Sequence, residues 1–346
     1  MEYIKVTSEN IEKEHICCAI SNNNDIQVSS KKAWLSERFE DGLVFLKSTE
    51  RGKCFIEYIP AENAWNPISA DDYMYIDCLW VAGSFKGHGY SSDLLNACIE
   101  DSKNKGKKGL CILASAKKKP FLADPKFLKY KGFQVCDEAD NGIQLWYLPF
   151  VENSTLPQFK ECAKHPHTDE MGYVLYYTNQ CPFNAKYVPV IEGIAKEKAI
   201  KFKAIHLLSK EEAQNAPTPI TTYALFFDGN YVTNEQMNEN VVVITTPLAM
   251  NFFADTHVPG KSLNLDGTPY RIVGVVETAS GCTPITQGNL WTASKFYEEE
   301  EFIGNYKAYI TTDNIDRCIS EINGVFDRYT QTRPKNFTYT MEIEKY

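Results

Sequence analysis

The pattern of apolar and polar residues predicts three successive parts of the chain. From Met1 to about Phe150, short apolar runs that suit β-strands alternate with amphipathic stretches that suit helices. The strand candidates are GLVFLKS (42–48), KCFIEYIP (53–60), YMYIDCLWVAG (73–83), LCILASA (110–116) and GIQLWYLPF (142–150). This alternation predicts a layered α/β domain over residues 1–150.

The rest of the chain divides at two further changes of pattern. Residues 151–170 mix turn residues with charge and predict a linker. Residues 171–238 show a new strand–helix–strand pattern, and a strongly apolar run, VVVITTPLAMNFF (241–253), begins a third pattern that runs to Tyr346. We therefore expect an α/β multidomain chain with domains at 1–150 and 171–238 and a small α+β extension at 239–346.

Net charge, apolar segments and cysteine content limit the kinds of molecule the protein binds and its location in the cell. The net charge of −9 over 346 residues predicts no nucleic-acid partner, because such proteins usually carry a basic face. No segment approaches the roughly 20 apolar residues that span a bilayer, and the polar N-terminus is unlike a signal peptide. Eleven scattered cysteines without a CxxC pair predict reduced thiols, no metal site and a cytoplasmic location.

One stretch carries a recognisable site, WVAGSFKGHGYSSDLLNACI (80–99), where an apolar strand passes through glycines into an amphipathic helix. Glycine permits tight left-handed turns and close approach to the backbone. A strand that ends in such a turn directs several N–H groups and the positive end of the helix dipole toward one point. This arrangement suits a phosphate or pyrophosphate, and a glycine-rich turn without a ligand is the alternative.

Residues 84–89, Ser-Phe-Lys-Gly-His-Gly, resemble the pyrophosphate loop of the GNAT acetyltransferases, Gln/Arg-x-x-Gly-x-Gly/Ala. Ser84 stands where Gln or Arg is usual. Downstream, FLADPKFLKYKGFQV (121–135) resembles the second half of the GNAT cofactor site. The resemblance covers most of residues 1–150. It implies a mixed central sheet with flanking helices, acetyl-CoA as the acetyl donor, and a small-molecule or peptide amine as the acceptor.

The resemblance also implies which residues form the site. Backbone N–H groups would bind coenzyme A, here those of Phe85, Lys86, Gly87, His88, Gly89, Tyr90 and Ser91. The general acid in this family is commonly a tyrosine at the position that is Leu128 here. Tyr130 is the nearby substitute, although two residues along a helix turn a side chain by about 200°. Asp77 and His88 are further candidates for proton transfer, with a buried hydrogen-bonded role or a solvent-facing role as the alternative for each.

In the second domain, YVLYYTNQCPFNAKYVP (173–189) places Cys181 at the start of a helix. A helix N-terminus lowers a thiol pKa, which makes Cys181 a candidate reactive thiol, with a free structural cysteine as the alternative. Thr218-Pro219 precedes a later strand, and the arrangement resembles the thioredoxin and glutaredoxin fold, in which a cis-proline loop faces the active cysteine. Asn184 stands in place of a second cysteine, which excludes a disulfide within the motif.

A GNAT domain joined to such a module resembles the YoaP-type acetyltransferases. The run from 241 to 277 resembles instead part of the periplasmic core domain of MacB-type ABC transporter permeases, with a hairpin around Asp266-Gly267. No catalytic constellation occurs there, so we expect a binding or structural role.

Taken together, these features predict an acetyl-CoA-dependent N-acetyltransferase of unknown amine specificity. The alternative is a non-catalytic protein that binds acyl-CoA or interacts through a thiol, since the usual tyrosine and the second cysteine are both absent.

Overall fold

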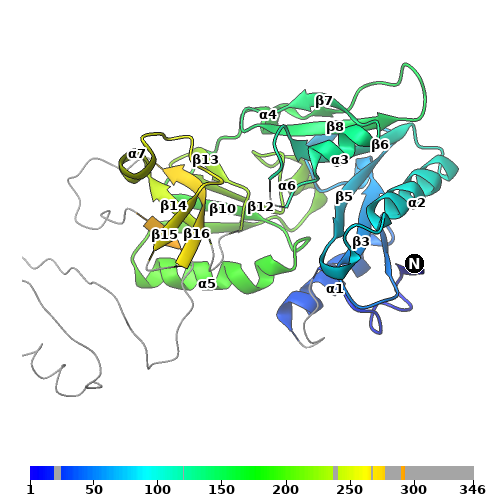
Figure 1. Cartoon of the computed structure of the whole chain (residues 1–346), viewed down its shortest axis with the longest axis horizontal. Coiled ribbons are helices and arrows are strands. Elements are labelled where there is room, and N and C mark those ends of the chain that lie inside the picture. Colours follow the sequence, from blue (N-terminus) through cyan, green and yellow to red (C-terminus); the bar gives the residue numbers. More distant parts are fainter. Residues whose placement is uncertain (19–24, 120, 237–240, 266–267, 277–289, 293–346) are drawn as a thin grey trace, which may run out of the picture. The chain divides into compact units, whose positions relative to one another are not determined.

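The computed structural model describes residues 1–18, 25–119, 121–236, 241–265, 268–276 and 290–292 (Figure 1). All of them belong to one compact unit, Met1–Ala279 with Gly288–Lys295. Most of the expected α+β extension at 239–346 lies outside the described residues.

The first domain is built on a seven-stranded sheet with the order β1-β2-β3-β5-β6-β8-β7. Its strands are β1 (Tyr3–Val6), β2 (Val44–Ser48), β3 (Cys54–Pro60), β5 (Tyr73–Val81), β6 (Gly109–Ser115), β7 (Gln134–Glu138) and β8 (Ile143–Pro149). β5 pairs with β6 in parallel, and the other neighbours in this sheet pair antiparallel. The expected mixed central sheet is confirmed.

Three helices flank this sheet: α1 (Ile26–Arg38), α2 (Tyr90–Asn104) and α3 (Pro125–Tyr130). Asp25 caps α1 and Asp124 caps α3, each by accepting a hydrogen bond from a backbone N–H in the first turn. α2 lies along β3 and β5 (Figure 1) and buries Leu94 and Leu95 in a shared apolar core. Burying each leucine contributes about 1.5–3 kcal/mol, which fixes α2 against the sheet.

The centre of the sheet opens where β5 and β6 stop pairing. β5 is paired with β6 only from Tyr73 to Ile76, although β5 continues along β3 to Val81. β6 likewise continues along β8 to Ser115. A bulge occurs at the same place, because Tyr58 pairs with Ile76 and Glu57 pairs with Cys78. Asp77 is the extra residue between these two pairs, and it lies at the opening of the sheet.

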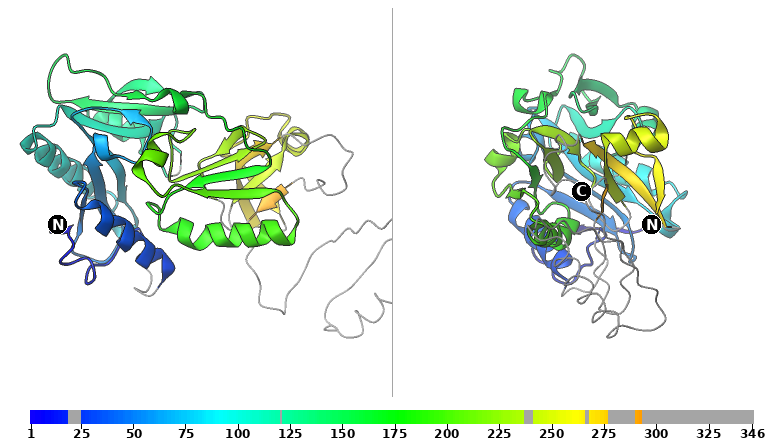
Figure 2. Two further views of the ribbon diagram at one scale, coloured as in Figure 1. Left: turned by 180° about the vertical axis from the view of Figure 1, so that it is seen from behind. Right: turned by 90° about the vertical axis from the view of Figure 1, so that its left-hand side faces the viewer.

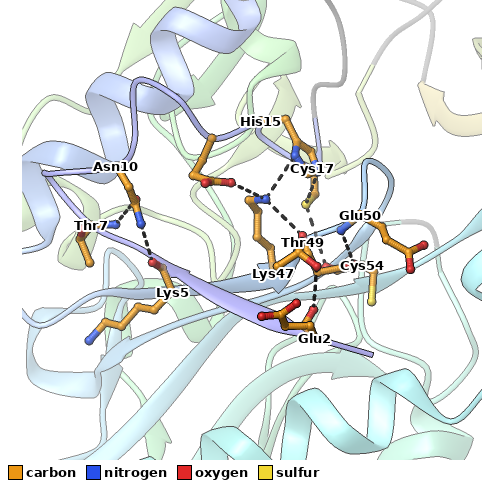
Figure 3. A network of polar contacts seen from close by, with 12 residues as sticks. Glu2, Lys5, Thr7, Asn10, His15, Cys17, Lys47, Thr49, Glu50 and Cys54 are labelled. Atoms are coloured by element: carbon orange, nitrogen blue, oxygen red, sulfur yellow. Dashed lines mark hydrogen bonds and ion pairs between the residues drawn. The ribbon is translucent and has the colours of Figure 1, made fainter.

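The segment before α1 is held across β2 by the polar network of Figure 3. Lys47, which is fully buried, donates to His15 Nδ1 at 3.2 Å and forms an ion pair with Glu14 at 2.8 Å. His15 Nε2 lies 3.6 Å from the sulfur of Cys17. Burial, and then the charge of Lys47, lower the pKa of His15. The network attaches the segment around Glu14 and His15 to β2.

A second sheet has the order β11-β10-β12-β13. It comprises β10 (Tyr173–Tyr177), β11 (Phe202–His206), β12 (Tyr223–Phe227) and β13 (Asn230–Thr233), with helices α5 (Phe183–Glu197) and α6 (Lys210–Gln214) between its strands. β10 and β11 are parallel, whereas β12 is antiparallel to both β10 and β13. α5 lies along this sheet (Figure 2) and packs Val188 against Leu175 and Leu225.

Short elements lie between the main strands and helices. They are the 3-10 turns η1 (Ala61–Asn63) and η2 (Gly83–Phe85), the two-stranded pair of β4 (Ile68–Ser69) with β9 (Gln158–Phe159), and α4 (Glu161–Lys164). Pairing of β4 with β9 attaches the expected linker at 151–170 to the first domain. Within the described residues, no helix is both long enough and apolar enough to cross a membrane.

A third sheet, with the order β15-β16-β14-β17, follows residue 240. Its elements are β14 (Val241–Thr245), α7 (Thr246–Phe253), β15 (Ser262–Leu265), β16 (Thr268–Val276) and β17 (Leu290–Thr292). The hairpin of β15 and β16 is confirmed. The boundary expected at residue 238 does not separate two cores, because Val241 and Val243 pack in one apolar cluster with Leu175 and Leu225 of the second sheet.

Candidate active site

The glycine-rich loop joins β5 to α2 in a conformation that needs glycine. Gly87 and Gly89 have φ angles of +84° and +83°, in the left-handed region, and Gly89 is the N-cap of α2. A Cβ atom added to either glycine would meet no heavy atom within 4 Å, so the space above the loop is open. The buried ring of Phe85 anchors the loop from below.

The loop presents a row of free backbone donors. The N–H groups of Phe85 and Lys86 donate to Ala82 and Gly83 within the 3-10 turn, and those of Ser92 and Asp93 donate to Gly89. Within the part of the chain that the structure describes, the intervening N–H groups of residues 87–91 have no acceptor. The expected set of donors, residues 85–91, is therefore corrected at its start.

These free donors lie at the N-terminus of the 15-residue helix α2, whose dipole adds partial positive charge. Lys86 and His88 are both exposed beside them, and the imidazole of His88 stacks on the ring of Tyr90 with centroids 5.5 Å apart. Free N–H groups, open space and a helix dipole together make a site for a phosphate or pyrophosphate group. The residues present fit the pyrophosphate of coenzyme A.

The structure places Tyr130 away from any polar contact of this loop. Its side chain is 81% exposed at the end of α3, while Leu128, at the position of the usual tyrosine, is 1% exposed. The two side chains therefore lie on opposite sides of the helix, as the 200° turn of about two residues predicts. Among the described contacts, Tyr130 has only the ammonium of Lys131, 5.4 Å from its ring centroid.

Asp77 is half-buried at the bulge, and its Oδ1 accepts a hydrogen bond of 2.9 Å from Nε2 of Gln180. Burial, and then the negative charge of Glu57, raise the pKa of Asp77 well above its usual range. A carboxyl group with a raised pKa exchanges protons closer to neutral pH, which suits a general base. The structure thus places one of the three predicted proton-transfer candidates at the opening of the sheet.

A buried ion pair lies on the same side of the sheet, and sequence reasoning missed it. Lys31 of α1 donates to both carboxylate oxygens of Glu57 of β3, at 2.8 and 2.7 Å, and both side chains are 1% exposed. Burial alone lowers the pKa of Lys31, but the carboxylate of Glu57 more than offsets this, and the pKa of Lys31 ends above its ordinary value. A lysine in an amphipathic helix usually faces solvent, so only tertiary contact reveals the pair.

Cys181 lies at the start of α5, as expected, but burial raises the pKa of its thiol. The backbone N–H of Phe183 acts in the opposite direction and is outweighed. Cys18 and Cys78, whose thiol pKa values burial also raises, lie within electrostatic reach of Cys181. The outcome is the opposite of the lowered pKa that the helix start predicts, because desolvation disfavours the thiolate more than the helix end favours it.

We therefore expect Cys181 to react slowly with an alkylating reagent. Cys162, which is exposed, should be alkylated first at neutral pH, because a reagent reaches it without local opening of the structure. Peptide mass spectrometry after treatment with limiting iodoacetamide measures both sites in one sample. Faster labelling of Cys181 than of Cys162 would instead support the sequence-based hypothesis that Cys181 is an activated thiol.

The proline loop also differs from the expectation. The Thr218–Pro219 peptide bond is trans rather than cis. Asn66 of the first domain donates to the Pro219 carbonyl at 2.9 Å, and the hydroxyl of Thr221 donates to the Trp65 carbonyl at 2.5 Å. These bonds hold the loop against the first domain in the trans geometry.

No group of three or more His, Cys, Asp or Glu side chains in the described ranges is arranged to hold a metal ion.

Comparison with known proteins identifies the family. A model of the acetyltransferase (GNAT) family matches residues 9–119, and a YoaP-like family model matches residues 201–241. Similar solved structures include ribosomal-protein-alanine N-acetyltransferase from Brucella melitensis, with 14% identity, coverage of 43% of this chain and 100% of that chain, and a TM-score of 0.32. YncA, a putative acetyltransferase from Salmonella typhimurium with acetyl-CoA, gives 14% identity, 44% and 97% coverage, and a TM-score of 0.32.

A longer match comes from a protein of Bacillus subtilis (strain 168) named the uncharacterized N-acetyltransferase YoaP. It is 44% identical over 241 residues, which cover 69% of this chain and 96% of that protein. The matched length includes both the acetyltransferase region and the module that follows it. The chain therefore belongs to the YoaP family of GNAT N-acetyltransferases, acyltransferases that use acetyl-CoA as the acetyl donor.

Proposed function

We propose that the loop at residues 87–91 holds the pyrophosphate of acetyl-CoA and that the acetyl group lies at the opening between β5 and β6. The row of free N–H groups at the start of α2 carries this assignment, because it is a complete anion site directly after β5. β5 beyond Ile76 supplies further support. Its backbone no longer pairs with β6, although it still pairs with β3, so the N–H groups on the edge that faces β6 are available to donate to the thioester oxygen.

Asp77 is the proposed general base. When bound, acetyl-CoA supplies an acyl group activated as a thioester. The carboxylate of Asp77 takes a proton from the ammonium group of the acceptor, which frees the nitrogen lone pair. A C–N bond forms, the C–S bond breaks with its electron pair on sulfur, the acylated nitrogen loses its extra proton, and the departing thiolate takes up a proton, so the proton count balances. Tyr130 and His88 remain weaker candidates for supplying it, because both are exposed.

For the second sheet we propose a thioredoxin-like domain that serves binding rather than dithiol chemistry. The strand order β11-β10-β12-β13, with one parallel and two antiparallel pairs, supports the assignment. The raised pKa of Cys181 and the Asn184 in place of a second cysteine support the non-redox role.

Two further assignments rest on less of the chain. Residues 239–346 are proposed to have a binding or structural role. The resemblance of residues 241–277 to part of a permease periplasmic core domain supports this proposal. A cytoplasmic location is supported by the nine cysteines within the described residues, all of which are free thiols. The acceptor is proposed to be an amine of a small molecule or peptide.

The test is steady release of coenzyme A from acetyl-CoA by the full-length protein with a panel of primary amines. We expect turnover with at least one amine, and the rate should rise with pH, because the raised pKa of Asp77 delays formation of its carboxylate. Asp77→Asn should lower kcat by about 10²–10⁴-fold and remove this pH-dependent rise.

Asp72→Asn is the matched control. Asp72 directly precedes β5 and is exposed, with its carboxylate bonded to Lys108, so its loss should leave kcat unchanged. Tight binding of coenzyme A without turnover by any amine would favour the alternative, a non-catalytic acyl-CoA-binding protein. Turnover by Asp77→Asn at the wild-type rate would remove Asp77 as the base.

A further inference from the structure

The two faces of β5 differ in whether an acceptor can reach the opening of the sheet. On the α2 face, Met74 and Ile76 are buried in the apolar cluster that contains Leu94 and Leu95. An acceptor cannot reach the opening of the sheet through this packed core. The α1 face carries polar groups instead, including Asp77, and the acceptor must approach from there.

Gln180, in the turn before α5, reaches that polar face from the second sheet. The side chain is 7% exposed, and its Nε2 donates to Oδ1 of Asp77. Its carbonyl oxygen Oε1 is buried and has no hydrogen-bond partner among the described residues. An unpaired buried carbonyl oxygen is unfavourable, and in a native protein a donor from water or from a bound ligand satisfies such a group.

The charged side chains on this face differ in whether they have a partner of opposite charge. Lys31 is fully engaged by Glu57, so this buried pair has no net charge to offer. Arg38 lies over the rings of Trp34 and Trp65 and donates to Glu37 and to the Trp34 carbonyl. Asp77, by contrast, has only the neutral amide of Gln180 as a hydrogen-bond partner in the described chain, and its Oδ2 accepts no hydrogen bond there.

We propose that Oδ2 of Asp77 and Oε1 of Gln180 together bind the protonated amino group of the acceptor, so that the second sheet contributes part of the acceptor site. An ammonium group has three N–H donors and a positive charge. Its donors match the two free acceptor oxygens, and its charge matches the negative charge of the Asp77 carboxylate. The substrate class is therefore a primary or secondary amine that arrives as a cation. This inference rests on the proposed function in its choice of Asp77 as the base.

The experiment compares a cation with its neutral isostere in the full-length protein. Binding of n-butylammonium and of n-butanol is measured by ligand-observed NMR titration, which needs no turnover. The wild-type protein should bind n-butylammonium more tightly than n-butanol. Gln180→Leu should reduce this preference by about tenfold or more, as expected for loss of a hydrogen bond to a charged group. Gln180→Glu, which retains an acceptor oxygen, should keep the preference.

Gln214→Leu controls for a purely structural effect of removing a glutamine that joins the two sheets. Gln214 donates to the carbonyls of Glu62 and Ala64 of the first domain, and no described contact joins it to Asp77. This variant should keep the ammonium preference even if its melting temperature falls. For any amine that is turned over, Gln180→Leu should raise KM and leave the dissociation constant of coenzyme A unchanged.

Equal binding of the cation and the alcohol by the wild-type protein, or an unchanged preference in Gln180→Leu, would overturn the inference. Failure of the proposed function looks different. In that case coenzyme A is not released with any amine, whereas the ammonium preference and its loss in Gln180→Leu persist.

Discussion

Replacing Lys31 with methionine is expected to lower the free energy of unfolding by about 3–5 kcal/mol. The carboxylate of Glu57 is 1% exposed and receives both of its close hydrogen bonds from Lys31. Without the ammonium group, a charge is left buried and unpaired, and the desolvation cost is no longer offset. Because the pKa of Lys31 is raised, its contribution persists through the neutral range and is lost only as pH rises through that raised value.

Chemical denaturation at neutral pH, followed by tryptophan fluorescence, measures the effect. Lys108→Met is the matched control, because Lys108 forms an exposed pair with Asp72 at 2.6 Å, and its loss should cost less than about 1 kcal/mol. The double variant Lys31→Met with Glu57→Leu should recover most of the lost stability, since it removes the stranded charge as well. A Lys31→Met protein as stable as the wild type would mean that Glu57 is not buried in the folded chain.

Replacing Gly87 with valine should weaken coenzyme A binding by about a hundredfold or more. A β-branched residue is strained at a φ of +84°, so the loop must rearrange. The row of N–H groups that begins at Gly87 would then no longer point at one anion, and several charge-assisted hydrogen bonds would weaken together. A hundredfold loss corresponds to about 2.7 kcal/mol of binding free energy.

Isothermal titration with coenzyme A measures this change. Gly106→Val is the control at the opposite end of α2, where a glycine has a φ of +70° and likewise faces open space. It should carry comparable backbone strain yet bind coenzyme A like the wild type. Unchanged affinity in Gly87→Val would contradict the assignment of the loop, and equal losses in both variants would attribute the effect to folding.

Features that depend only on local geometry could be predicted from consecutive residues. The apolar runs predicted five strands of the first domain, namely β2, β3, β5, β6 and β8. These could be predicted because the alternation and length of an apolar run depend only on consecutive residues. The glycine-rich loop was predicted for the same reason, but as residues 85–91, and only the N–H groups of residues 87–91 are free among the described contacts. Gly87 and Gly89 adopt left-handed φ angles between a strand and a helix, and that junction creates an anion site without any distant partner.

The electrostatics of the site and the boundaries of the apolar cores depend on contacts between residues that are distant in sequence. Gln180 meets Asp77 across 103 residues of sequence, and Lys31 meets Glu57 across 26, so no local pattern pairs them. Cys181 shows why local reasoning failed: the start of α5 favours its thiolate, but burial is a property of the whole fold and disfavours a charge more strongly. The shared core of Val241 and Leu225 likewise depends on which faces meet, and a composition change at residue 238 does not reveal it.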